Sequence, residues 1–322
     1  MKIVIISCFC LMFASCTQTE KSENPAADSA VPDISWTSSG LDSCQVLSLV
    51  FLSDNSLFAG TNYGLYKSAD NGQSWNFVNQ DVSENSVTCF CIRPDGYVLA
   101  GTSSKGIFIS GDYGENWTCI GLLGIAVSSI AVNSKNIIFA GTVGDGIYVS
   151  DALYEEWTKV SPGAEYLRYS SLLINTTDVV FAGATGVYRS NDNGKTWSLK
   201  NKGMGNWPVY SLIYDRNGNL AAGTDLGGFF RSEDSGESWI RLNKGLTNTE
   251  ITALAINNEG YIFTGTWRGG VYLSTDNGEN WNDINSGLIN MQIYTLAVSP
   301  DNYLFAGTLR GIFRTKLKLY LQ

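Results

Sequence analysis

Carboxylates are the first side chains in this sequence whose type and spacing suggest chemistry. Five aspartates lie in copies of one motif, Ser-x-Asp-x-Gly-x-(Ser/Thr/Asn)-Trp, and these are Asp70, Asp112, Asp192, Asp234 and Asp276. Carboxylates can bind metal ions or transfer protons in acid–base catalysis. Each copy belongs to a different repeat of the chain, so the five side chains are expected to lie too far apart to cooperate. We therefore expect each carboxylate to accept hydrogen bonds from the N–H groups of its own turn.

The absence of histidine limits the enzymatic chemistry that is available. The chain has no His, which excludes Ser-His-Asp triads, His-ligated zinc and histidine general bases. Glycoside hydrolysis remains possible, because it needs only two carboxylates or a Tyr–Glu pair. The catalytic candidates outside the repeated motif are Asp145 and Asp225. No metal site and no cofactor are expected.

Aromatic and cationic residues that break the repeat form the candidate binding site. Trp207 and Trp267 lie outside the regularly spaced tryptophans, and Arg268 follows the second directly. The other candidates on the same face are Arg310, Tyr166 and Arg168. Aromatic rings beside guanidinium groups suit a sugar or a peptide, through stacking and bidentate hydrogen bonds. In the alternative interpretation, the two tryptophans only cap the channel of the fold or pack against each other's loops.

A repeat that fills most of the chain positions these residues. Each copy has a hydrophobic pair, usually Gly-Thr, a short turn, Gly, a hydrophobic-aromatic pair and the acidic turn. The first glycines of the copies are Gly60, Gly101, Gly141, Gly183, Gly223, Gly265 and Gly307, with periods of 40 to 42 residues. A period of about 40–45 residues with short strands is typical of a β-propeller with one four-stranded blade per repeat. The sequence thus predicts an all-β, seven-bladed β-propeller.

The strands of one blade are labelled A to D from the axis outward. In the sixth repeat they are expected at 251–256, 261–266 and 270–274, with strand D beginning at Trp281. The B–C and D–A connections of a propeller emerge on one face, here called the loop face, where ligands usually dock. The A–B and C–D turns emerge on the other, here called the Asp-box face. Both tryptophans that break the repeat are expected on the loop face.

The tryptophans also indicate how the ring closes. Six of the nine begin the fourth strand of a blade, and these are Trp75, Trp117, Trp157, Trp197, Trp239 and Trp281. Trp36 continues the column before the first blade, whereas the seventh repeat ends without such a residue. We therefore expect segment 34–37 to be the outer strand of the last blade, paired with 311–315. In the alternative, segment 316–321 supplies that strand.

The acidic turns resemble Asp-boxes, also called bacterial neuraminidase repeats, over nearly all of the chain from residue 34 onward. This resemblance implies that the aspartates are structural and peripheral. Sialidases share these boxes, but the nearest string here to their Arg-Ile-Pro motif is Ile92-Arg93-Pro94 on the Asp-box face, so no sialidase catalytic residue is transferred. Xyloglucanase-type hydrolases and photosystem II assembly-factor-like proteins also have seven-bladed propellers of this kind. The chain is most similar in size and blade number to the assembly-factor-like group, which implies protein binding without catalysis.

The N-terminal residues predict export and lipidation. Lys2, an apolar run and small residues before Cys16 are typical of a secretory signal, and the cysteine resembles a lipoprotein cleavage site. The expected organisation is a signal peptide at 1–15, a flexible tether at 16–33 and the propeller at 34–322. In the alternative, the signal is an ordinary secretory one with a chance cysteine. Removing Lys2 leaves 20 basic and 30 acidic residues, so no nucleic-acid partner is expected.

The remaining cysteines are expected to be structural. Cys44, Cys89, Cys91 and Cys119 allow three pairings, which the sequence does not distinguish. Cys89 lies in a column that holds Ser, Thr or Ala in the other repeats, so a small side chain is what this column requires.

Two functions follow from these features. The first is a lipid-anchored, non-catalytic propeller of the bacterial cell envelope, on the outer-membrane or periplasmic side, that binds a protein partner or acts in assembly through its loop face. The alternative is a glycan-binding protein or a glycoside hydrolase of the sialidase or xyloglucanase type. In both, Cys16 would carry the membrane lipid.

Overall fold

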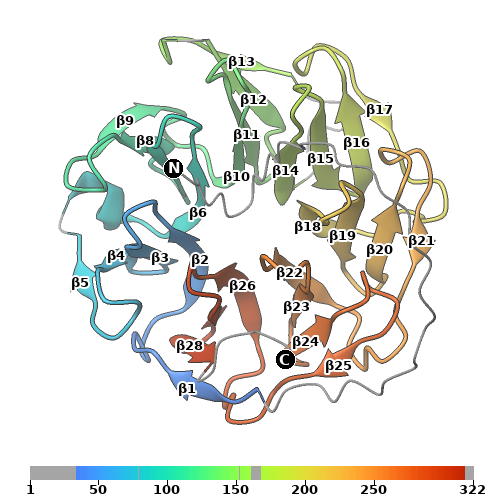
Figure 1. Cartoon of the computed structure of the whole chain (residues 1–322). Helices are drawn as coiled ribbons and strands as arrows, with labels where there is room; N and C mark the ends of the chain where they lie inside the picture. The colour runs from blue at the N-terminus through green and yellow to red at the C-terminus, as the bar shows by residue number, and fades with distance from the viewer. Residues whose placement is uncertain (1–33, 79, 152, 161–167, 316–322) are drawn as a thin grey trace, which may run out of the picture.

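The computed structural model describes residues 34–78, 80–151, 153–160 and 168–315. Its 28 strands form seven four-stranded antiparallel sheets arranged as blades of a ring (Figure 1). The only helical segment in these ranges is a single-turn 3-10 helix, η1 (Asp81–Glu84). The prediction of an all-β, seven-bladed propeller is confirmed.

The strands of the first four blades follow chain order from the axis outward. Blade one holds β2 (Val46–Phe51), β3 (Leu57–Thr61), β4 (Gly64–Ser68) and β5 (Asn76–Phe77). Blade two holds β6 (Val87–Ile92), β7 (Val98–Thr102), β8 (Ile107–Ser110) and β9 (Thr118–Gly121). Blade three holds β10 (Val127–Val132), β11 (Ile138–Thr142), β12 (Ile147–Ser150) and β13 (Trp157–Lys159). Blade four holds β14 (Ser171–Ile174), β15 (Val180–Ala184), β16 (Gly186–Ser190) and β17 (Ser198–Leu199).

The last three blades have the same arrangement, except that the seventh takes its outer strand from the start of the chain. Blade five holds β18 (Val209–Tyr214), β19 (Leu220–Thr224), β20 (Gly228–Ser232) and β21 (Ile240–Arg241). Blade six holds β22 (Ile251–Ile256), β23 (Ile262–Thr266), β24 (Val271–Ser274) and β25 (Asn282–Asp283). Blade seven holds β26 (Ile293–Val298), β27 (Leu304–Thr308), β28 (Ile312–Thr315) and β1 (Trp36–Ser38).

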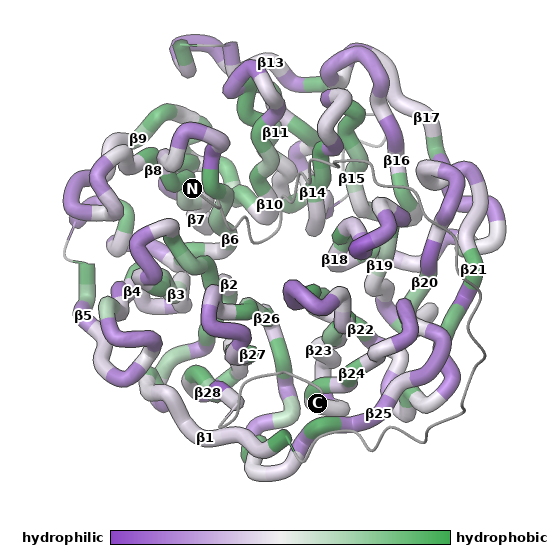
Figure 2. The backbone as a smooth tube through the Cα atoms, in the orientation of Figure 1, coloured by the Kyte–Doolittle hydropathy of each residue, from purple (hydrophilic) through white to green (hydrophobic). Residues whose placement is uncertain are grey.

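Strand B of each blade forms the centre of the core. All five residues of this strand are buried in every blade, and hydrophobic residues follow the strands while many turns are hydrophilic (Figure 2). The repeated glycine has a steric reason. A Cβ atom at Gly60 would lie 2.3 Å from the Ser48 hydroxyl and 2.5 Å from the Val87 carbonyl of the next blade. The glycine thus lets adjacent blades approach closely.

Strand β1 closes the ring as the sequence predicts. Trp36 pairs with Thr315 in register, and its indole Nε1 donates a 2.5 Å hydrogen bond to the Ile284 carbonyl of blade six. Only 2% of the Trp36 surface is exposed. Because β1 occupies the outer position beside β28, the last sheet has four strands without segment 316–321, which lies outside the described residues.

Candidate functional site

The Asp-boxes form closed hydrogen-bond networks on the Asp-box face. In blade five, Asp234 Oδ1 accepts from the backbone N–H and Oδ2 from the hydroxyl of Ser238, at 2.8 and 2.5 Å. The Ser232 hydroxyl donates to Asp234 and accepts from Gly236 N–H. These bonds, those from Ser238 first, lower the pKa of Asp234 to about 2. The same arrangement occurs at Asp70, Asp112, Asp192 and Asp276.

Blade three preserves part of this turn without its aspartate. Tyr154 replaces the motif glycine and still adopts a positive φ of 62°. Asp151, which directly follows the strand, accepts the Glu155 N–H at 2.8 Å. The phenol of Tyr154 accepts a hydrogen bond from Arg93 of blade two. The turn therefore keeps a structural role after the motif has been lost.

The tryptophans of the motif connect neighbouring blades. The indole Nε1 of Trp281 donates to the Leu242 carbonyl of blade five at 2.9 Å. Trp75, Trp157, Trp197 and Trp239 donate in the same way to the preceding outer strand or its continuation. Trp117 instead donates to Gly114 in its own turn. The tryptophan column thus links most outer strands to the blade before them, a role that the spacing of the tryptophans alone does not show.

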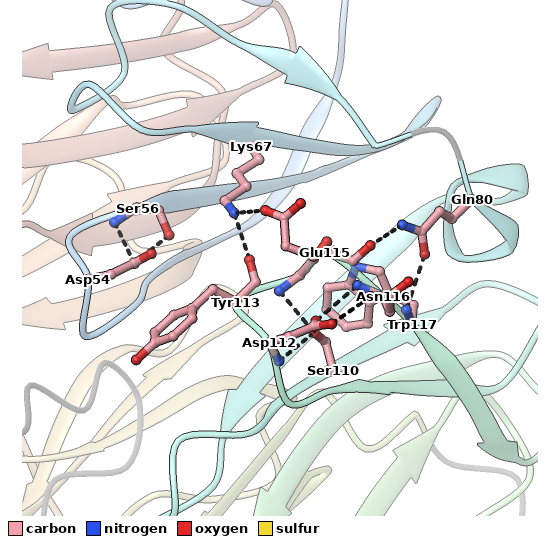
Figure 3. A network of polar contacts seen from close by, with 11 residues as sticks. Asp54, Ser56, Lys67, Gln80, Ser110, Asp112, Tyr113, Glu115, Asn116 and Trp117 are labelled. Carbon is pink, nitrogen blue, oxygen red and sulfur yellow. Dashed lines mark hydrogen bonds and ion pairs between the residues drawn. The ribbon is translucent and has the colours of Figure 1, made fainter.

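A cation before the motif serine adds a second contact between blades. Lys67 of β4 donates to the Tyr113 carbonyl and to Glu115 of blade two, each at 2.8 Å (Figure 3). In the same turn, the side chain of Gln80 bonds to the backbone of Glu115 and Trp117. Equivalent cations in other blades are Arg189, Arg231 and Arg314. The Asp-box face is thus largely engaged in holding the ring together.

The loop face carries the residues that break the repeat. Trp207 is 38% exposed and lies against the B–C turn of blade five, where a Cβ at Gly227 would come within 2.7 Å of its ring. Trp267 packs edge-on against Tyr294 of blade seven, with ring centroids 5.4 Å apart. Each tryptophan therefore packs on its own neighbour and leaves part of its ring accessible. This arrangement combines a packing role with an available aromatic surface.

Tyr210 lines the axial channel and interacts electrostatically with charged residues of neighbouring connections. Burial is the main cause that raises the pKa of the Tyr210 phenol. The negative charges of Asp225 and Glu250 and a hydrogen bond with Asp225 raise it further, whereas the positive charge of Arg168 lowers it. Burial and then Asp225 raise the pKa of Glu250, which Arg268 partly offsets. The structure thus brings Asp225, Arg168 and Arg268 together with two residues that the sequence analysis missed, Tyr210 and Glu250. We call these five residues the mouth cluster.

Of the two missed residues, Glu250 breaks a column of the repeat. It precedes strand A, a position occupied elsewhere by Gln, Ser, Ala, Arg or Pro. The column of Tyr210 also holds a tyrosine in blade seven, Tyr294. A comparison of columns would therefore have identified Glu250 but would not have singled out Tyr210.

The other predicted site residues have their own surroundings or lie outside the described part of the chain. Asp145 bonds to Lys159 Nζ at 2.8 Å and Tyr148 Oη at 2.7 Å within blade three, and these two bonds, Lys159 first, lower its pKa. The exposed Arg310 lies in the B–C turn of blade seven, where its backbone N–H donates to Thr308. Tyr166 and Cys16 lie outside the described residues. Of the two catalytic candidates, only Asp225 therefore has a second carboxylate as an electrostatic neighbour.

Strands A surround an axial channel of about 240 Å³. Its wall includes a column of small polar side chains, namely Ser48, Cys89, Ser129, Ser171, Ser211 and Thr295. A Cβ at Gly101 would lie 2.5 Å from Cys89 Sγ, so a larger side chain at Cys89 would not fit. Burial raises the pKa of this thiol to about 12, which makes it unreactive. Cys44, Cys89 and Cys119 are not in disulfides.

The BNR/Asp-box repeat family matches residues 188–199, in blade four. No curated protein matches the sequence. Solved structures share the fold at low sequence identity. The extracellular domain of the one-component system BT4673 from B. thetaiotaomicron is 18% identical with a TM-score of 0.71, over 84% of this chain and 38% of that chain. The chain thus spans well under half the length of this relative.

Two further structures cover most of the chain. YCF48 bound to D1 peptide is 18% identical with a TM-score of 0.69, over 90% of this chain and 98% of that chain. The GH74 xyloglucanase from Xanthomonas campestris is 14% identical with a TM-score of 0.68, over 87% of this chain and 53% of that chain. These similarities establish the propeller fold. In the described part of the chain, no helix is long and apolar enough to cross a bilayer.

Proposed function

We propose that this chain is a lipid-anchored propeller of the bacterial envelope that binds a protein partner through its loop face. The distribution of exposed apolar side chains carries this proposal. Of the fourteen exposed large hydrophobic residues in the described ranges, eight lie in B–C or D–A connections, three in outer strands and three in turns of the Asp-box face. The eight are Tyr63, Leu123, Val143, Trp207, Leu226, Ile289, Met291 and Leu309. A concentration of exposed apolar residues on one face is typical of a protein-interaction surface.

Part of this apolar surface spans adjacent blades. The Met291 carbonyl accepts a hydrogen bond from Gly270 in the B–C turn of blade six. The next residue, Gln292, accepts one from Leu309 in the B–C turn of blade seven. The Leu226 carbonyl accepts from the Thr249 hydroxyl of the following connection. These bonds hold the apolar residues on an ordered surface, which reduces the entropy lost when a partner binds.

The known propellers give this proposal context. The YCF48 structure holds a bound peptide, and the B. thetaiotaomicron domain is extracellular. A non-catalytic role that relies on recognition of another polypeptide is compatible with a chain that lacks histidine. The exposed apolar side chains of the loop face favour a protein partner over a small polar ligand, because a protein can cover them with its own apolar surface.

Partner binding is tested by capture from envelope extracts with matched variants. Leu226→Asp changes the loop face, whereas Ile240→Asp changes outer strand β21, and both native side chains are 55% exposed. We expect the wild type and Ile240→Asp to capture the same protein and Leu226→Asp to lose it. Equal capture by both variants would exclude Leu226 from the interface, and loss through Ile240→Asp alone would move the interface to the blade edge.

The lipid anchor is a separate part of the proposal and has its own test. Growth with a labelled fatty acid is expected to label the wild-type chain and to leave Cys16→Ala unlabelled. Cys119→Ala is the control, because its native thiol is exposed. Export without labelling would show an ordinary secretory signal.

A glycan is the second candidate ligand, and the mouth cluster is the observation that favours it. Asp225 and Glu250 provide the two carboxylates that glycoside hydrolysis needs. The pKa of Glu250 is raised, which suits the general acid of such a pair. A glycan array probed with the wild type and with Trp207→Ala/Trp267→Ala tests binding at this face. Release of reducing ends by the wild type but not by Glu250→Gln would establish hydrolysis. Absence of binding and of release would leave protein recognition as the function of the loop face.

A further inference from the structure

A cavity lies on the opposite face from the proposed partner surface. It has a volume of about 380 Å³ and lies between the A–B turns of blades four, five and six. Its lining includes Thr176, Tyr214, Arg216, Ser235, Ile256 and Asn258. Small-molecule sites in proteins usually measure about 300–1,000 Å³, so this cavity suits a small ligand.

The cavity coincides with a break in the repeat. The last residue of strand A is aliphatic in five blades and Phe51 in another, whereas blade five has Tyr214. Tyr214 and Ile256 are half-buried, while the residues at this position in the other blades are buried. The Tyr214 ring packs against Phe181 in a T-shaped contact, with ring centroids 6.4 Å apart. The cavity therefore has a preformed aromatic and aliphatic wall.

Apart from Asp215, the polar side chains of the lining are neutral or cationic. Asp215, the carboxylate residue in the lining, is 4% exposed and its oxygens accept from Asn217 N–H, Asn219 N–H and Asn219 Nδ2. Its carboxylate is thus used by its own turn. Thr176, Ser235 and Asn258 are exposed at the rim, where hydroxyl and carboxamide groups can both donate and accept hydrogen bonds.

Arg216 is held in place across the boundary between two blades. Its NH1 donates to the Glu259 carbonyl at 3.2 Å, and its side chain lies against Gly260, where a Cβ would come within 3.0 Å of Cδ. A guanidinium group has five N–H donors, so this bond leaves others for a ligand. The group is therefore oriented before any ligand arrives.

We propose that this cavity is a carbohydrate site that takes a mono- or disaccharide, with a sugar ring against Tyr214 and its hydroxyls bonded to Asn258, Thr176 and Arg216. An aromatic wall beside mixed donors and acceptors is complementary to a sugar, which has an apolar C–H face and a polar rim. The engaged carboxylate disfavours a cation as the ligand. This site is distinct from the loop face and does not depend on the proposed partner.

The test is saturation-transfer NMR and calorimetry on the purified full chain with a panel of hexoses, hexuronic acids and their disaccharides. We expect at least one member to bind the wild type, and Tyr214→Ile to weaken that binding by at least about tenfold. Isoleucine is the native residue at this position in blades four and six, so this change suits the fold. Asn258→Ala changes an exposed side chain and provides a second variant if Tyr214→Ile is unstable.

Ile240→Asp on the outer strand β21 is the matched control, because its native side chain is 55% exposed and lies away from the cavity lining. It is expected to bind the same sugar as the wild type, and retention of full binding in both Tyr214→Ile and Asn258→Ala would overturn the proposal. Failure of every panel member to bind the wild type would also overturn it. Neither result would affect capture of a protein partner, which reports on Leu226.

Discussion

The Asp-box aspartates are the residues through which we expect pH to affect the stability of the fold. The pKa values of Asp70, Asp112, Asp192 and Asp234 are lowered from 3.8 to about 2, chiefly by the side chain and backbone of the residue four positions later. A carboxyl group with a lowered pKa in the folded state stabilises the fold above its unfolded value. This stabilisation is lost as the pH falls from about 4 towards 2.

We therefore expect the melting temperature of the wild type to fall over this pH range. The variant Asp192→Asn/Asp234→Asn should melt lower at pH 7 and lose less on acidification, because two of the titrating groups are gone. Calorimetry at pH 5, 4, 3 and 2 measures both slopes. Identical slopes for the two proteins would show that these carboxylates do not control acid unfolding. Asp42→Asn, which lies outside the motif, is the control.

The candidate site residues show what the sequence could predict at this scale. Trp207 and Trp267 were identifiable because they are absent from the regular tryptophan column. Tyr210 was missed because blade seven also has a tyrosine in its column, whereas Glu250 stands out only when its column is compared across blades. Both interact electrostatically with Asp225, although they lie far from it in the sequence. Local spacing does not reveal such a grouping, because the folding of the blades creates it.

The strands of the sixth repeat were predictable to within a residue, whereas the closing strand was expected at 34–37 and β1 spans Trp36–Ser38. The outer strand of the sixth repeat shows why such bounds shift. The sequence predicts that strand D begins at Trp281, whereas β25 begins at Asn282. The backbone N–H of Trp281 instead donates to the Lys244 carbonyl of the preceding connection, and its indole bonds to Leu242. Contacts with the neighbouring blade thus draw the residue out of its own sheet. A pattern read within one repeat does not contain that information.

The cations between blades give a prediction for whole elements. Arg231 of β20 is 13% exposed at its side chain and bonds to the Asn277 carbonyl and to Glu279 of blade six. Arg231→Ala removes both contacts and is expected to cost about 1–2 kcal/mol of unfolding free energy. The control is Arg241→Ala on the exposed strand β21. Denaturant titration measures the free energy of unfolding of both variants. An equal loss of unfolding free energy in the two would contradict a stabilising role of Arg231 between blades.

For the whole molecule, the closed ring makes the two ends of the described chain interdependent. Blade seven is assembled from β26, β27 and β28 near the end of the sequence and β1 near its start. Arg314 also donates to the Asn71 carbonyl of blade one. Without β1, strand β28 would be an exposed edge with unpaired backbone groups. The proposed partner and sugar sites lie on opposite faces of the same ring, so both would depend on the pairing of β1 with β28.

We expect Trp36→Ala to be the most destabilising of these substitutions. It removes a side chain that is 2% exposed and an indole hydrogen bond to blade six, at a cost of about 3–5 kcal/mol. Truncation after Thr315 is the matched comparison, because it removes segment 316–322 and leaves the pairing of β1 with β28 intact. The melting temperature should therefore fall strongly in Trp36→Ala and little after the truncation. If the truncation instead lowers the melting temperature as much as Trp36→Ala does, the segment after Thr315 contributes as much to ring closure as β1.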